Sequence, residues 1–239
     1  MLKTSVAGHA LVLNGVFLNG AGPFRMLIDT GNSSSIVRPQ IARRLNLKPA
    51  YSVDQASIAG VRRVPVAILD EVHAGSVSDR SVEAIIGDVF QSGVDGVLGE
   101  SWLVRHDYLL DYRNRRIGLD GPPPVSGIRV PLRSAAGRPV VVASVEGSPR
   151  ELVVDSGASA LVLYEKAAVD GGLTTRLQAN GGAVRALACT VHLSLSGARE
   201  RLLEAVRIDL HGLGPGLLPA SAFASVFVSN REGFVEFGR

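Results

Sequence analysis

Two similar stretches of sequence decide the fold of this chain. Residues 26–37 read Met-Leu-Ile-Asp-Thr-Gly-Asn-Ser-Ser-Ser-Ile-Val, and residues 152–163 read Leu-Val-Val-Asp-Ser-Gly-Ala-Ser-Ala-Leu-Val-Leu. In each stretch, three apolar residues typical of a buried strand lead into a carboxylate, a hydroxyl and a glycine. Asp29 and Asp155 are separated by about half of the 239-residue chain. One acid at the tip of a buried strand in each half predicts a single site built from two repeats.

The composition favours a globular protein rich in short strands and tight turns, with 46% apolar residues and 27 glycines. The formal net charge of +3 comes from scattered arginines, and no stretch interleaves basic residues with aromatic ones, so nucleic acid is not an expected partner. Cys189 is the only cysteine, which excludes an intrachain disulfide. No apolar run reaches the roughly 18–20 residues of a membrane span, and the N-terminus lacks the pattern of a signal peptide.

The first half reads as strands with short helices between them. Asn14-Gly15 predicts a tight hairpin turn, and Pro39 predicts the start of a short helix over residues 40–46. Residues 51–86 read as successive strands with a reversal at 58–61. Val97-Leu98-Gly99 then leads into a short helix near residues 101–106, and a hairpin over residues 108–119 closes the half.

The second half repeats this order. A reversal is expected at Asn180-Gly181-Gly182, an apolar segment at Leu217-Leu218-Pro219, a short helix over residues 221–226, and a closing strand pair after it. The Pro- and Gly-rich residues 121–127 predict an extended linker between the halves. We therefore predict an all-β protein with few short helices and two similar lobes, residues 1–120 and 128–239.

At these motifs the chain resembles the aspartic peptidases. Each half is similar to one retropepsin-like subunit, and the whole is similar to a single-chain, pepsin-like arrangement of two lobes related by a pseudo-twofold axis. The resemblance rests on Asp29-Thr30-Gly31 with Val97-Leu98-Gly99, and on Asp155-Ser156-Gly157 with Leu217-Leu218-Pro219. Pro219 departs from the glycine that the family pattern expects.

The resemblance implies a site and a reaction. Asp29 and Asp155 would form the catalytic dyad, while Thr30, Gly31, Ser156 and Gly157 would form its supporting turns. The substrate-binding flaps would be Ile58, Ala59, Gly60 and Val61 in the first half and Asn180, Gly181 and Gly182 in the second. Two close carboxylates share a proton, so that one can activate a water while the other protonates a peptide carbonyl.

The resemblance further implies an endopeptidase that acts on extended polypeptides in limited processing of protein substrates, as a monomer and with no cofactor or metal. Relatives of this bacterial type suggest a periplasmic or exported protein, although the sequence itself gives no localisation. Two alternatives stay open: a peptide-binding protein of the same fold that cleaves weakly or not at all, and an assembly protein that pairs through its edge strands.

Other candidate residues carry weaker signals. The five histidines lack metal-type spacing, and no Gly-x-Ser-x-Gly motif is present. Asp95, Glu100 and Asp111 lie near the closing element of the first half, where solvated or turn-capping roles are expected.

Overall fold

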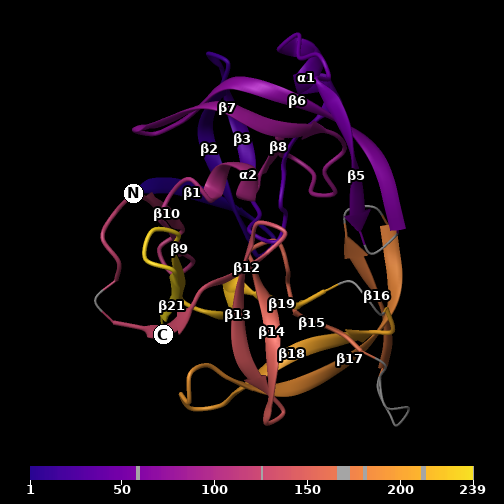
Figure 1. The fold of residues 1–239 in the computed structure, drawn as a ribbon, viewed down its shortest axis with the longest axis vertical. Coiled ribbons are helices and arrows are strands. Elements are labelled where there is room, and N and C mark those ends of the chain that lie inside the picture. Colours follow the sequence, from indigo (N-terminus) through magenta and orange to yellow (C-terminus); the bar gives the residue numbers. More distant parts are fainter. Residues whose placement is uncertain (58–59, 125, 166–172, 180–181, 211–213, 239) are drawn as a thin grey trace.

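The computed structural model describes residues 1–57, 60–124, 126–165, 173–179, 182–210 and 214–238. β-Strands dominate these residues, as the all-β prediction requires, and they form two sheets (Figure 1). The helices are short: α1 (Pro39–Arg44), α2 (Glu100–Leu103) and the 3-10 helix η1 (Ala220–Ala222). Within the described residues, neither α-helix is long and apolar enough to cross a membrane.

The larger sheet holds 13 strands and contains all the strands of the first half. These are β1 (Leu2–Ala7), β2 (Ala10–Leu18), β3 (Ala21–Ile28), β4 (Ser35–Val37), β5 (Tyr51–Ser57), β6 (Gly60–Ala74), β7 (Val77–Ile86), β8 (Gly96–Leu98), β9 (Tyr108–Asp111) and β10 (Arg116–Leu119). Three strands of the second half join it: β11 (Ile128–Pro131), β20 (Ser225–Ser229) and β21 (Phe234–Gly238). Because β20 pairs with β9, the closing strands of the two halves form one continuous surface.

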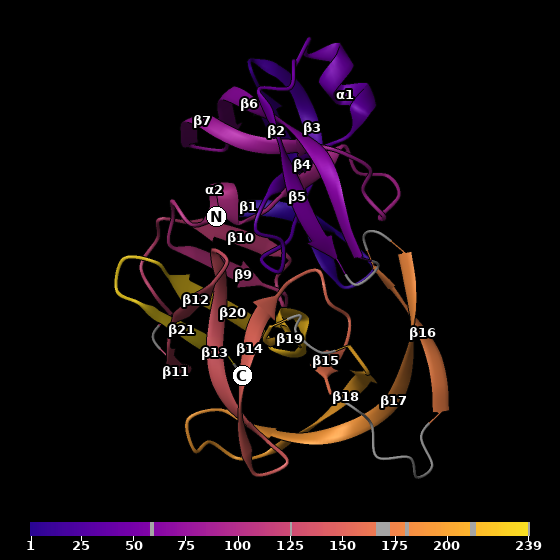
Figure 2. The ribbon, with the colours of Figure 1, turned by 45° about the vertical axis from the view of Figure 1, so that its right-hand side comes forward.

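The smaller sheet holds 8 strands, all from the second half. They are β12 (Arg133–Ala135), β13 (Arg138–Val145), β14 (Ser148–Asp155), β15 (Leu161–Tyr164), β16 (Leu173–Ala179), β17 (Gly182–Ser194), β18 (Arg201–Ile208) and β19 (Gly216–Pro219). Figures 1 and 2 show this sheet below the first-half strands, with the shared closing strands to one side.

The two sheets repeat one order of pairing. The run β2-β3-β8-β4-β7-β6-β5 of the first half corresponds strand for strand to β13-β14-β19-β15-β18-β17-β16 of the second. β3 pairs in parallel with β8, and β14 pairs in parallel with β19, with Met26 opposite Gly96 and Leu152 opposite Gly216. Each repeat therefore ends its central strand at an aspartate in the same register.

A single large apolar cluster joins the halves. It packs Trp102 and Leu98 of the first half with Leu152, Leu218 and Phe237 of the second, all fully buried. Smaller clusters lie under each sheet, around Val97 and around Val162. The shared core and shared closing strands fix the two repeats relative to one another.

Two local predictions are wrong. Asn14-Gly15 forms no hairpin turn: β2 runs through it with a register irregularity, and Gly15 adopts a φ of 90°, so the pair makes a bulge in a continuous strand. The helix expected over residues 221–226 is confined to η1, because Ser225 already pairs with Asp111 in the closing sheet. The helix expected after Pro39 is confirmed as α1.

Candidate active site

Asp29 lies at the end of β3, where the strand leaves the sheet. Its backbone N–H donates to the carbonyl of Leu98 (3.1 Å), and its own carbonyl accepts from the N–H of Asn32 (3.2 Å). The N–H of Gly31 donates to its Oδ1 (3.1 Å). The neighbouring strand and the following turn therefore both hold the first carboxyl in place.

Asp155 ends β14 in the same way and is only 7% exposed. Its Oδ1 accepts hydrogen bonds from the backbone N–H groups of Gly157 (2.7 Å) and Ala158 (3.1 Å). Each carboxyl is thus stabilised by two backbone N–H groups of its own turn, those of Gly31 and Asn32 at Asp29 and those of Gly157 and Ala158 at Asp155.

Thr30 and Ser156 tie the two turns together. The N–H of each residue donates to the hydroxyl oxygen of the other, both at 3.0 Å. The hydroxyl of Thr30 donates to the carbonyl of Val154 (2.6 Å), and that of Ser156 donates to the carbonyl of Ile28 (2.8 Å). Both side chains are fully buried, so these four hydrogen bonds fix one aspartate turn against the other.

Gly31 and Gly157 let each turn approach the opposite carboxyl. A Cβ atom on Gly31 would lie 2.3 Å from Cγ of Asp155, and one on Gly157 would lie 2.8 Å from Oδ1 of Asp29. These separations are shorter than any van der Waals contact. A side chain at either position would force the opposite carboxyl to move, so the two glycines let the two predicted site acids stay close to the opposite turns.

The electrostatics of the two acids follow from this placement. Burial raises the pKa of Asp29, and the charge of Asp155 and a hydrogen bond between the two carboxyls raise it further. Burial also raises the pKa of Asp155, but the N–H groups of Gly157 and Ala158 and the bond from Asp29 act against the rise. The pair therefore favours a proton on Asp29 and the negative charge on Asp155.

Residues 15–102 match the aspartyl protease family. The match supports an aspartic peptidase, and it spans β3, the Asp29 turn, β4 to β8 and the start of α2. A comparison with curated proteins found no match.

Pro219 of the second half occupies the place that Gly99 holds in the first. The N–H of Gly99 donates to the hydroxyl of Ser35 (3.2 Å). Ser35 pairs with β7 in the first half as Leu161 pairs with β18 in the second, and Leu161 has no hydroxyl to accept a bond. Proline has no N–H to donate, so the donor and the acceptor are lost together. Pro219 stays paired with Asp155 in the sheet.

The predicted flaps correspond to two hairpins of matching register. Ser57 pairs with Gly60 at the end of β5–β6, and Ala179 pairs with Gly182 at the end of β16–β17. Gly60 and Val61 are exposed on β6, and Gly182 is exposed on β17. Ile58, Ala59, Asn180 and Gly181 lie outside the described residues. Figures 1 and 2 show β5 and β16 extending toward one another on the same side of the molecule.

Glu100 is a third carboxyl near the site, and the solvated role expected for it is wrong. It is 3% exposed, its N–H donates to the carbonyl of Asn32 (2.9 Å), and its Oε1 accepts from the hydroxyl of Tyr108 (2.9 Å). Burial raises the pKa of Glu100 to about 8. The hydrogen bond from Tyr108 lowers this pKa, and the charge of Asp29 raises it. The glutamate follows Gly99 directly, so the segment that packs beside the Asp29 turn also buries it.

Two further residues near the site carried no signal in the sequence. The Nε2 atom of His9, in the turn between β1 and β2, lies 2.6 Å from the carbonyl oxygen of Gly157. The hydroxyl of Tyr112 is buried, and burial, followed by the charges of Asp155 and Asp29, raises its pKa. His9 therefore contacts the second aspartate turn, and Tyr112 lies close enough to both acids for their charges to raise its pKa.

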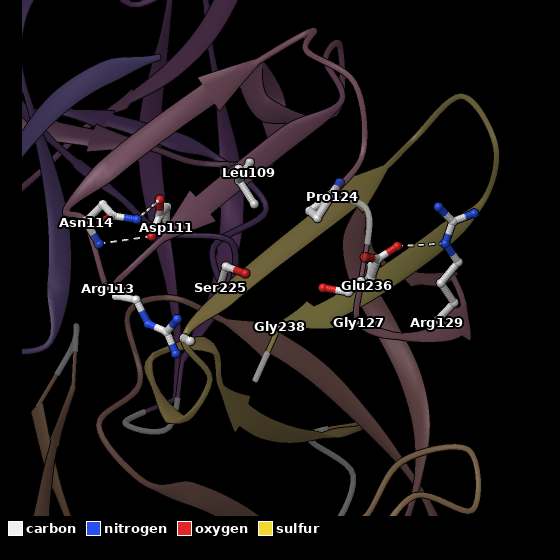
Figure 3. Close-up of a pocket in the computed structure, with 12 residues that line it drawn as sticks. Leu109, Asp111, Arg113, Asn114, Pro124, Gly127, Arg129, Ser225, Glu236 and Gly238 are labelled. Atoms are coloured by element: carbon white, nitrogen blue, oxygen red, sulfur yellow. Dashed lines mark hydrogen bonds and ion pairs between the residues drawn. The ribbon is translucent and has the colours of Figure 1, made fainter.

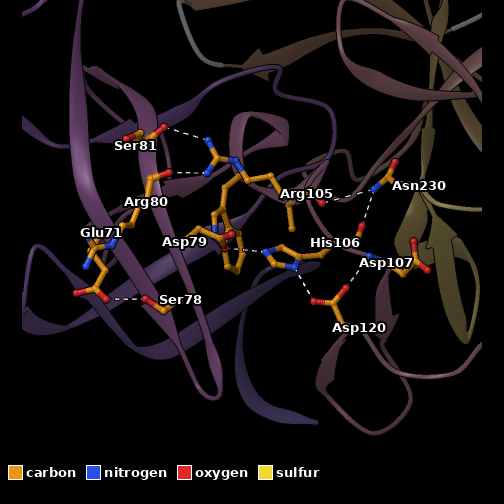
Figure 4. A network of polar contacts seen from close by, with 12 residues as sticks. Glu71, Ser78, Asp79, Arg80, Ser81, Arg105, His106, Asp107, Asp120 and Asn230 are labelled. Carbon is orange, nitrogen blue, oxygen red and sulfur yellow. Dashed lines mark hydrogen bonds and ion pairs between the residues drawn. The ribbon is translucent and has the colours of Figure 1, made fainter.

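A second polar network lies away from the two acids (Figure 4). The buried ring of His106 contacts Asp79 through Nε2 (2.8 Å) and Asp120 through Nδ1 (2.7 Å). Arg231, from the second half, reaches Asp120 (2.6 Å). Burial raises the pKa of Asp120, but hydrogen bonds from His106 and Arg231 outweigh this effect and keep the pKa below its ordinary value. This network connects the two halves.

A hollow of about 890 Å³ lies beside the closing strands (Figure 3). Asp111 and Ser225 line one part of it, and Arg129 and Glu236 line another, as an ion pair at 2.7 Å. Neither Asp29 nor Asp155 reaches it. Within the described residues, no group of three His, Cys, Asp or Glu side chains is placed to hold a metal ion.

Proposed function

We propose that this chain is an aspartic endopeptidase that hydrolyses peptide bonds with Asp29 and Asp155 as its catalytic pair. The observation that carries the proposal is the approach of each acid to the glycine of the opposite turn, at separations where a Cβ atom would displace the carboxyl. The aspartyl protease match over residues 15–102 supports protease activity in general. The match ends before Asp155, so the pairing of the two acids is part of this proposal.

The unequal surroundings of the two acids suggest their roles. Asp155, with its two backbone donors, would be the carboxylate that takes a proton from the attacking water. Asp29, whose pKa is raised by burial and further by the charge of Asp155, would donate its proton to the oxygen of the peptide carbonyl. The water oxygen bonds to the carbonyl carbon. Collapse of the tetrahedral intermediate then breaks the C–N bond as Asp155 gives its proton to the amine nitrogen and a hydroxyl of the intermediate returns a proton to Asp29.

The matching strand order of the two halves supports an origin by internal duplication. With both aspartate turns on one chain, a monomer would contain the whole site. The hairpins β5–β6 and β16–β17 would act as two flaps over an extended polypeptide, which would pair with their strands. We further propose limited processing of protein substrates as the role. The alternative is a peptide-binding protein of the same fold that does not cleave, because the second half carries Pro219 where the first half carries Gly99.

An unbiased peptide library tests the proposal. The purified chain is incubated with the library from acidic to neutral pH, and mass spectrometry identifies the products, with and without a statine-type transition-state analogue. We expect cleavage at internal peptide bonds that the analogue suppresses. Binding of library peptides without any cleavage across the whole pH range would support the alternative instead.

A further inference from the structure

The hairpin β16–β17 carries two arginines directly opposite one another. Arg176 on β16 and Arg185 on β17 are partners in the antiparallel register, and both side chains are exposed. Like charges placed opposite on one face of a sheet destabilise the strand pair. Within the described residues, neither guanidinium has a carboxylate partner, because the ion pairs of the second half involve other arginines.

The two arginines lie on the outer face of the hairpin. The opposite face carries Leu177, Val184 and Ala186, which pack in the small apolar cluster under the sheet. Thr174 and Ala183 flank the arginines, and together with Thr175 these residues line a hollow of about 490 Å³. The two cations and the hydroxyl of Thr174 therefore share one face of the hairpin, whereas Thr175 lies on the opposite face with Ala186.

A third arginine lies on the same face of the sheet. Arg207 on β18 lies opposite Leu187, on the same face as Arg185. Its partner is Glu165 (3.1 Å), which also pairs with Arg150 (2.9 Å). One carboxylate is thus shared by two arginines.

β16 is also the last strand of its sheet. The outer edge of such a strand presents backbone N–H and C=O groups that an extended polypeptide can pair with. In that geometry every second side chain of the added strand lies on the face that holds Arg176. Figure 2 shows β16 at the border of the second sheet, on the side toward which β5 also extends.

We infer that Arg176 and Arg185 form a binding site for an acidic segment of the polypeptide substrate, which pairs with the edge of β16 and places carboxylates at alternate positions beside the two guanidinium groups. This inference rests on the proposed function and names its substrate class. A small free anion could bind the two guanidinium groups but could not form backbone hydrogen bonds with the edge of β16.

The test measures binding separately from cleavage. The Asp29→Asn variant is titrated into a fluorescein-labelled peptide with Asp or Glu at every second position, and into its counterpart with Asn and Gln, by fluorescence anisotropy. We expect the acidic peptide to bind more tightly, and we expect Arg176→Gln/Arg185→Gln in the same background to weaken that binding about tenfold. The neutral peptide should bind both proteins alike, and the preference should fall as salt increases.

The matched control is Arg43→Gln/Arg199→Gln, which removes the same charge from two exposed positions outside the hairpin. It should keep the acidic preference. Thermal unfolding checks that the hairpin variant is folded, and no loss of stability is expected, since the substitution relieves the repulsion between opposed arginines. Equal binding of the two peptides, or an equal loss of binding in the control, would overturn the inference. Neither result depends on whether the wild-type protein cleaves peptides.

Discussion

Thr30 and Ser156 exchange hydrogen bonds across the two halves, each accepting from the N–H of the other and donating to the carbonyl just before the other's aspartate. The exchange is buried and reciprocal. It connects β3 to β14 at the point where each strand presents its acid. The relative position of the two carboxyls therefore depends on two hydroxyl groups.

We expect Thr30→Val to destabilise the protein and to reduce cleavage sharply. The substitution keeps the shape of the side chain but leaves the buried N–H of Ser156 and the carbonyl of Val154 without a partner, at a cost of about 1–3 kcal/mol for each. Urea unfolding and peptide cleavage measure the two effects. Thr30→Ser keeps the hydroxyl and is the control; a similar loss in both variants would show that the hydroxyl is not responsible.

Gly31→Ala should abolish activity. Its Cβ would overlap the carboxyl group of Asp155, so one aspartate turn must shift away from the other. Gly121→Ala is the matched control, because a Cβ there meets nothing within 4 Å. Steady-state cleavage of one peptide by both variants decides the matter, and an active Gly31→Ala enzyme would mean that the two acids need not lie this close.

Glu100→Gln should make the protein more stable at neutral pH. Since burial raises the pKa of Glu100 from 4.5 to about 8, its contribution to stability is complete below its ordinary value and is lost as pH rises towards 8. Each pH unit in that window costs the wild type up to about 1.4 kcal/mol. Glutamine still accepts from Tyr108 and has no charge to bury. Urea unfolding at pH 5 and pH 7 measures the free energy of unfolding of both proteins, and the variant should be more stable relative to the wild type at pH 7 than at pH 5. The same difference at both pH values would contradict the account.

His106→Ala should weaken the connection between the halves. It removes a buried ring that contacts Asp79 and Asp120 and leaves both carboxylates short of a partner, at a cost of about 3 kcal/mol. The exposed His192 provides the control, since it has more than half of its side chain in solvent. The free energy of unfolding in urea should fall for His106→Ala and stay nearly unchanged for His192→Ala.

The strand content and the two aspartate turns could be predicted because they depend on local pattern. An apolar run ending in Asp, a hydroxyl residue and Gly predicts a strand and its turn without knowledge of any distant contact. Asn14-Gly15 misled for the same reason: the pair favours a turn locally, but pairing on both sides of β2 keeps the strand continuous and turns Gly15 into a bulge.

The burial of Glu100 and the contact of His9 could not be predicted in this way. Glu100 is buried because Tyr108 and the Asp29 turn close around it, and His9 reaches Gly157 only after the second half has folded against the first. Both depend on residues far away in the sequence. The lack of an N–H at Pro219 could be read from the sequence, whereas the matching lack of a hydroxyl at Leu161 required the strand pairing.

The most direct test of the central claim is the cleavage rate of one identified peptide by Asp29→Asn and by Asp155→Asn, compared with the wild type. Each substitution preserves the size of the side chain and removes a group that can gain or lose the proton. We expect both variants to lose activity by about a thousandfold or more while remaining folded. Full activity in either one would contradict a shared site.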